Sequence, residues 1–83
     1  MAEKKPIGEI THYYGGIGVA IIKFNRKVDV GETVHFKGAS TDFTQTIGSM
    51  QFEHKDIQGA KKEQEVGIKV DNKVREGDEV FEV

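Results

Sequence analysis

One short pattern, Val-x-x-Gly-acid-x-Val, occurs twice in this chain, at residues 28–34 and again at residues 74–80. Its glycine is Gly31 in the first copy and Gly77 in the second. A type II turn needs a positive φ at its third position, and glycine adopts that conformation without the strain that a side chain introduces. We therefore expect Gly31 and Gly77 to be structural turn residues, each leading into an alternating strand. Because the chain makes a similar corner twice, the pattern favours a β architecture.

Strand-like patterns fill most of the remaining sequence. They cover residues 7–13, 17–24, 33–37, 43–54, 66–70 and 80–83. Residues 17–24 are rich in β-branched side chains, which is typical of a strand buried on both faces for part of its length. Within residues 43–54 the apolar parity changes at Gly48-Ser49, which favours a β-bulge at a barrel corner. Residues 55–65 lack an apolar stripe and are predicted to be a hairpin connection.

These patterns predict an all-β fold, a single small antiparallel β-barrel of six to seven strands without a long helix. A chain of 83 residues is long enough for one domain with a thin core. We expect that domain to span residues 6–83. A mobile, charged leader is expected at residues 1–5, before the only proline, Pro6.

The charge balance and composition exclude several classes of protein. Twelve Lys and Arg residues face fourteen Asp and Glu residues, for a net charge of −2. Any RNA contact must therefore come from a local basic patch, because phosphate neutralisation supplies most non-specific affinity. No apolar run approaches the roughly 20 residues that cross a bilayer, and the first residues lack the apolar core of a signal peptide. We expect no membrane association and a cytoplasmic location.

The sequence offers no constellation that would make the chain an enzyme. It has no Gly-x-x-x-x-Gly-Lys-Ser/Thr loop, so neither nucleotide binding nor nucleotide hydrolysis is predicted. Cysteine is absent, and no serine or threonine has a recognisable base partner. His12, His35 and His54 lie in three separate segments without metal-ligand spacing, so no metal and no other cofactor is predicted.

One candidate binding site stands out near the start of the chain. His12, Tyr13 and Tyr14 precede Gly15-Gly16, and exposed rings beside flexible glycine can stack on bases. Lys23, Arg26 and Lys27 lie at a nearby hairpin end and would supply phosphate contacts. The alternative is that one tyrosine belongs to the core and the other rings cover a barrel mouth, because a small barrel needs aromatic side chains to complete its core.

An ordered set of motifs also resembles a known module. The matching motifs are Gly16-Ile17-Gly18-Val19-Ala20, residues 28–34, Ile47-Gly48-Ser49-Met50, Ala60 followed by Val66-Gly67, and residues 74–80. Over residues 7–83 the chain resembles domain two of translational GTPases such as elongation factor Tu, the translation-protein β-barrel. It is most similar to stand-alone elongation factor-like proteins, which also resemble the C-terminal barrel of some collagenase-like peptidases.

The resemblance implies a non-catalytic β-barrel module that binds ribosomal RNA, tRNA or the ribosome. The alternative is an accessory interaction domain that acts with a separately encoded collagenase-like peptidase or RNA-modifying enzyme. In translational GTPases the first strands of this barrel help to hold the 3′ end of tRNA, the region that contains His12–Tyr14 here. The chain departs from the translational GTPase pattern in two segments. Residues 19–22 are apolar, where elongation factor Tu has basic and polar residues, and residues 61–65 include Glu63 and Gln64 where a turn glycine is usual.

Overall fold

The structure, a computed structural model, describes residues 5–53 and 55–83, and within them the chain forms ten β-strands and no helix. The strands are β1 (Gly8–Tyr14), β2 (Val19–Phe24), β3 (Val28–Asp29), β4 (Thr33–Lys37), β5 (Asp42–Thr46), β6 (Met50–Phe52), β7 (Lys55–Ile57), β8 (Gly59–Ala60), β9 (Glu65–Lys69) and β10 (Glu79–Glu82). Most of the leader predicted at residues 1–5 lies outside the described residues. No helix of the described segments is long and apolar enough to cross a membrane.

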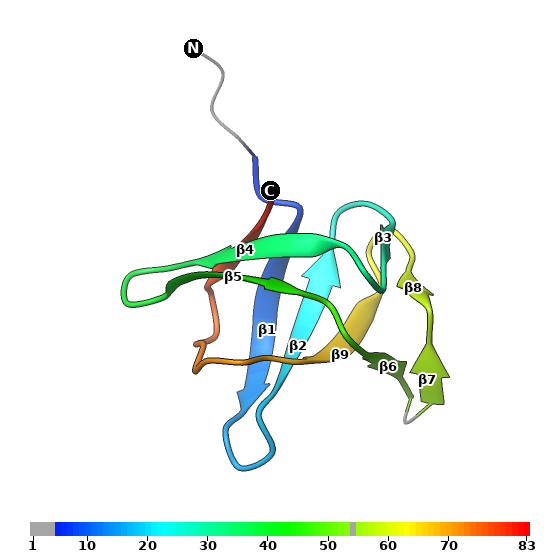
Figure 1. Ribbon diagram of the computed structural model, residues 1–83, viewed down its shortest axis with the longest axis horizontal. Coiled ribbons are helices and arrows are strands. Elements are labelled where there is room, and N and C mark those ends of the chain that lie inside the picture. The colour runs from blue at the N-terminus through cyan, green and yellow to red at the C-terminus, as the bar shows by residue number, and fades with distance from the viewer. Residues whose placement is uncertain (1–4, 54) are drawn as a thin grey trace.

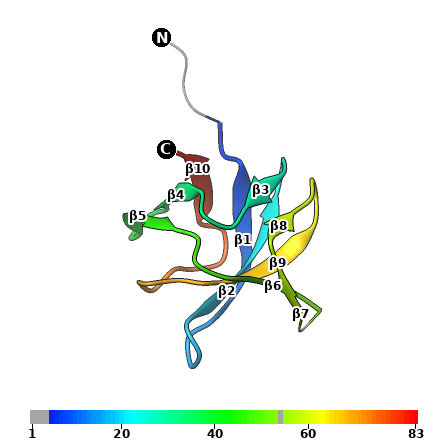
Figure 2. The same cartoon turned by 45° about the vertical axis from the view of Figure 1, so that its right-hand side comes forward.

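Eight of the strands form one curled antiparallel sheet in the order β5-β4-β10-β1-β2-β9-β6-β7 (Figure 1). The remaining two, β3 and β8, pair with each other in a separate two-stranded sheet (Figure 2). The end strands β5 and β7 are not paired with each other, so the sheet is a half-barrel rather than a closed barrel. The predicted all-β, antiparallel class is therefore confirmed.

The predicted count of six to seven strands is not confirmed. The strands that the sequence did not reveal are the short β3, β7 and β8, each of two or three residues. Residues 55–65, predicted as a plain connection, contain two of them. Strands this short have too few residues to show alternation. They form by backbone pairing, β3 with β8 and β7 with β6.

Gly48-Ser49 separates two strands instead of forming a bulge within one. Before it, β5 pairs with β4 at one end of the sheet order; after it, β6 pairs with β9 and β7 near the other end. The parity change in the sequence therefore marks the place where the chain crosses the open side of the half-barrel. A backbone hydrogen bond fixes the crossing segment, because the Ile47 amide donates to the Glu32 carbonyl at 2.9 Å.

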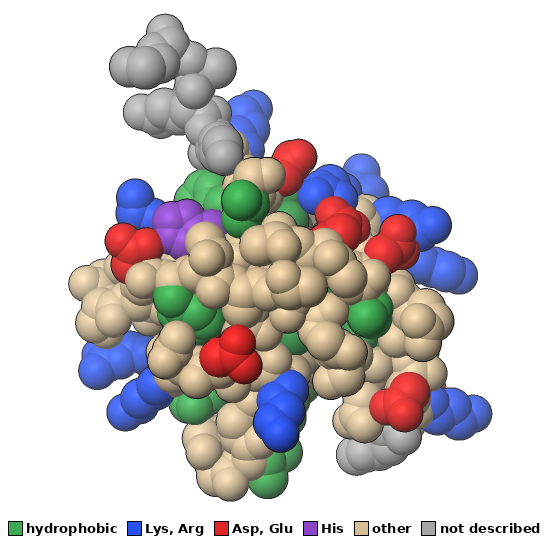
Figure 3. All heavy atoms as spheres, viewed as in Figure 1, with side chains coloured by type: hydrophobic (Ala, Val, Ile, Leu, Met, Phe, Trp, Pro, Cys, Tyr) green, Lys and Arg blue, Asp and Glu red, His purple; other side chains and the backbone are tan. Residues whose placement is uncertain are grey.

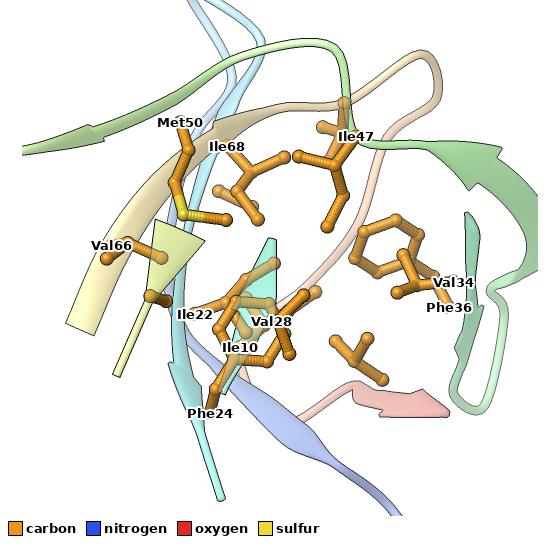
Figure 4. Close-up of a cluster of buried hydrophobic side chains, with 14 of the residues drawn as sticks. Ile10, Ile22, Phe24, Val28, Val34, Phe36, Ile47, Met50, Val66 and Ile68 are labelled. Atoms are coloured by element: carbon orange, nitrogen blue, oxygen red, sulfur yellow. The ribbon is translucent and has the colours of Figure 1, made fainter. Parts of the chain in front are cut away.

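The core fills the concave side of the curled sheet (Figure 4). In β2 the side chains of Ala20, Ile22 and Phe24 are fully buried, as the two-residue period of a strand requires. Val66 and Ile68 of β9 reach the same core from the neighbouring strand. Each of the larger buried side chains, Val, Ile or Phe, contributes roughly 1.5–3 kcal/mol by leaving water.

The two copies of the repeated pattern form matching corners. Gly31 has φ of 99° and Gly77 has φ of 90°, and each is the third residue of a turn closed by a backbone hydrogen bond. Each glycine amide then donates to a carbonyl of a passing segment, that of Ile47 or Ile10, at 2.8 and 2.9 Å. The amides of Ile47 and Ile10 in turn donate to the residue after each glycine, at 2.9 Å in both corners.

The turn that lacks the usual glycine keeps a left-handed conformation. Glu63 has φ of 65°, and its amide donates to the Phe24 carbonyl at 2.6 Å. The Gln64 side chain accepts a hydrogen bond from the Lys61 amide at 3.0 Å and closes the turn. Glu63 therefore occupies a conformation that glycine adopts with less strain.

Candidate binding surface

A β-bulge in β1 decides which of the predicted aromatic residues face outward. The pairing of β1 with β2 shifts between Ile10 and His12, so His12 lies opposite Ile21 and Tyr14 opposite Val19. Tyr13 consequently packs against the core, whereas Tyr14 is 48% exposed. The His12 and Tyr14 rings lie on the outer face with their centroids 4.2 Å apart.

The predicted basic residues lie at the other end of the same hairpin. Lys23 pairs with Glu9 on β1 and with Glu65 on β9, so carboxylates border it on both sides. Tyr14 pairs with Val19, and four residues of strand from Val19 to Lys23 span roughly 13 Å. The structure therefore separates the predicted stacking rings from the predicted phosphate contacts.

Arg26 is occupied by contacts within the chain. Its Nη2 lies 3.3 Å from a Glu32 carboxylate oxygen and 4.0 Å from one of Glu82, and its Nη1 donates to the Lys27 carbonyl at 2.6 Å. Lys27 itself is exposed. On the face shown in Figure 3, Lys and Arg side chains lie mainly around the rim, and acidic side chains lie among several of them.

An apolar groove lies on the outer face of β2, β9 and β6. Its volume is about 470 Å³. The lining side chains come from the β1–β2 hairpin, from these three strands and from the turn after β6: Tyr14, Ile17, Val19, Ile21, Gln51, Phe52, Glu53 and Glu65, around Gly67. We call it the outer groove.

Gly67 forms the floor of the outer groove. A β-carbon built on Gly67 would lie 3.3 Å from Val19 Cγ1 and 3.5 Å from Ile21 Cδ1. The missing side chain thus leaves these two β2 residues half-buried instead of covered. The expectation that residues 17–24 are buried on both faces for part of their length is therefore wrong, because Val19 and Ile21 on the outer face are only half-buried. The signal that would have located the groove is the apolar run of β2 beside a strand with glycine between Val66 and Ile68.

The outer groove continues into an acidic hollow. Ile21, Phe52, Glu53 and Glu65 line both, and the hollow adds Lys23, Glu63 and Gln64. Among the described residues, three glutamates and one lysine therefore surround this end of the surface. Glu53 and Glu63 are also the non-glycine residues with positive φ in the described segments, at 52° and 65°.

The histidines do not converge on a metal site among the described residues. His12 Nδ1 lies 3.5 Å from a Glu76 carboxylate oxygen, and His35 Nε2 lies 2.5 Å from Asp42 Oδ1. His12 is in β1 and Glu76 in the turn before β10, whereas His35 and Asp42 are in β4 and β5. His54 lies outside the described residues.

Comparison with curated proteins finds a peptidase-like relative, and no family model matches the chain. The chain is 37% identical over 79 residues to an uncharacterized protease of Methanocaldococcus jannaschii. The match covers 94% of this chain but 19% of that protein. The chain thus spans about a fifth of the length of this relative.

Solved structures with the same fold are those of the C-terminal domain of a putative U32 peptidase. The C-terminal domain of a putative U32 peptidase from Geobacillus thermoleovorans superimposes with a TM-score of 0.88 at 22% identity, covering 95% of this chain and all of that domain. A second crystal structure of that domain gives a TM-score of 0.86 at 23% identity, with 96% and 93% covered. At these identities the likeness establishes the fold. It agrees with the resemblance to the C-terminal barrel of collagenase-like peptidases, whereas the translation-factor resemblance is unconfirmed.

Proposed function

We propose that this chain is a non-catalytic accessory domain that acts together with a U32 peptidase-type protein in the cytoplasm. The main support is that nearly all of this chain matches about a fifth of a protease-like relative. The same fold forms the C-terminal domain of another protein of that type. A module that is one part of a larger protein in its relatives is expected to work by contact with the remaining part.

The surface supports a binding role. The outer groove is apolar and continues into the acidic hollow, and contiguous exposed apolar surface with a polar rim is typical of interaction sites. The catalytic constellations that peptide hydrolysis needs were not predicted from the sequence. Hydrolysis is therefore the task of the partner, and this domain recognises or positions it.

The test is complex formation with the whole U32 peptidase-type protein of the same organism. We expect the two purified proteins to elute together in size-exclusion chromatography and to give a measurable dissociation constant by calorimetry. We expect this chain alone to hydrolyse neither GTP nor a peptide substrate. Failure to bind at tens of micromolar, or hydrolysis that a point mutation in this chain abolishes, would reject the proposal.

RNA or ribosome binding is the second candidate, and the exposed His12–Tyr14 ring pair favours it. Rings placed in this way can stack on unpaired bases. The neighbouring carboxylates of Lys23 and the ion pairs of Arg26 weaken the electrostatic part of such binding. Titration with bulk tRNA at low and moderate salt separates the two candidate functions. RNA binding requires an affinity that falls as salt rises and that Tyr14→Ala reduces.

A further inference from the structure

We propose that the outer groove receives an apolar segment of the peptidase-type partner, and that Lys or Arg residues beside that segment pair with the adjoining acidic hollow. The inference rests on the proposed function and names the surface and the chemistry of its partner. The apolar groove supports the apolar segment of the partner, and the acidic hollow supports the basic residues beside it.

The apolar part departs from what a solvated sheet face shows. An antiparallel sheet with one face on the core normally alternates apolar and polar residues. In β2 the outward residues Val19 and Ile21 are instead β-branched and apolar. Ile17 is 68% exposed and Tyr14 48% exposed beside them, and both line the same groove. These side chains form one continuous surface that a partner can cover.

Gly67 gives the groove its depth. Its neighbours in β9, Val66 and Ile68, point into the core, so position 67 faces outward between β2 and β6. Any side chain there would lie against Val19 and Ile21 and fill the space. A partner side chain can therefore reach the apolar side chains of β2 directly over the β9 backbone.

Charge complementarity indicates which residues should flank the apolar segment of the partner. Glu53, Glu63 and Glu65 line the acidic hollow, with Lys23 as the one cation among the described residues of that lining. Opposite potentials across an interface steer association and exclude partners of the wrong charge. An apolar segment with neighbouring Lys or Arg can pack in the groove and pair with the acidic hollow, whereas the hollow repels an acidic segment.

The decisive experiment compares calorimetric affinities for the whole U32 peptidase-type protein. Gly67→Val fills the groove with a residue that favours strands, so we expect a well-folded variant that binds at least ten-fold more weakly. Gly48→Val is the matched control, because a β-carbon at Gly48 meets nothing within 4 Å. It adds the same side chain outside the groove and should leave the affinity unchanged. Circular dichroism and the thermal midpoint verify that both variants fold.

Charge reversal tests the second half of the inference. The double change Glu53→Lys and Glu63→Lys should weaken binding and reduce its dependence on salt. Asp42→Lys with Asp71→Lys is the control, since both residues are exposed and line neither the groove nor the acidic hollow. Tighter binding by the Glu53→Lys, Glu63→Lys variant would overturn the assignment of a basic partner segment.

The outcomes separate this inference from the proposed function. If the wild-type chain binds the partner and Gly67→Val binds equally well, the accessory role stands and the outer groove is rejected. If the wild-type chain does not bind, the proposed function fails and this inference falls with it. If the chain alone forms a dimer in sedimentation that Gly67→Val dissociates, the occupant is a second copy and the inference is overturned.

Discussion

Asp78 and Glu32 hold the same place in the repeated pattern, and both carboxylates close their own turn. Asp78 accepts from the Arg75 amide at 2.9 Å, and Glu32 accepts from the Asp29 amide at 2.7 Å. Their surroundings differ, because Asp78 is 6% exposed and also accepts from the Thr41 hydroxyl at 2.5 Å. The acid in the pattern is therefore a turn-capping group, and in the second copy it also anchors a distant loop.

Asp78→Ala should destabilise the fold by about 2 kcal/mol, because it leaves the Arg75 amide and the buried Thr41 hydroxyl without their acceptor. Glu32→Ala is the matched change in the other corner and should cost about 1 kcal/mol or less, because that carboxylate is partly solvated. Urea denaturation of both variants measures the difference. Equal losses would show that burial of Asp78 adds nothing to its capping role.

Tyr13 and Tyr14 are adjacent in sequence but should respond differently to truncation. Tyr13→Ala removes a ring that packs on the core and should cost about 2 kcal/mol or more. Tyr14→Ala should change stability by less than about 0.5 kcal/mol, because the ring is exposed, while weakening partner binding. Thermal denaturation and calorimetry give the two readouts. A large stability loss for Tyr14→Ala would show that its ring is part of the core.

At the scale of elements, the turns rather than the strands carry the unusual backbone. Gly31 and Glu63 both have positive φ, and each donates its amide to a carbonyl of another segment. The strands follow ordinary alternation except in β1, where the bulge before His12 reverses which side chains face the core. The bulge explains why the outer face carries His12 and Tyr14 beside Val19 and Ile21.

Opposite substitutions at these two turns should have opposite effects. Gly31→Val forces a β-branched residue to positive φ and should cost about 1–2 kcal/mol or more. Glu63→Gly removes such strain and, after the entropic cost of glycine, should stabilise by about 0.5 kcal/mol. Chemical denaturation midpoints test both. An unchanged midpoint for Gly31→Val would contradict the positive φ that the structure gives this residue.

At the scale of the whole molecule, one core ties the two ends of the described chain together. The Ile7 amide donates to the Val80 carbonyl at 2.7 Å, and β1 lies between β10 and β2 in the sheet order (Figure 1). The side chain of Gln45 bonds the Lys69 carbonyl at 3.0 Å and the Asp71 amide at 2.9 Å, joining β5 to the chain after β9. The half-barrel is thus linked across its open side by side-chain and short-strand contacts.

Residues 6–83 should therefore unfold as one unit. We expect coincident transitions by far-ultraviolet circular dichroism and tyrosine fluorescence, because all the long strands share one sheet and one core. The dichroism spectrum should be that of a β protein. Two separated transitions would instead indicate two independent parts and would contradict the predicted single domain.

Sequence alone was sufficient for the features that depend on local chemistry. Alternation placed the long strands, and the repeated pattern located the corners at Gly31 and Gly77, because glycine is favoured wherever a turn needs positive φ. The antiparallel class followed from many short strands and turn residues. These properties arise within a few residues of chain, so local sequence carries them.

Tertiary structure alone decided the sheet order, the short strands and the outer groove. Nothing local to β3 or β8 predicts that Val28 pairs with Ala60, because that partner comes from a distant part of the chain. The bulge in β1 turned Tyr13 inward and left Tyr14 outside, and Gly67 opened a groove only because β9 lies beside Val19 and Ile21 of β2. A binding surface is made by residues that meet across strands, and the register that brings them together belongs to the whole fold.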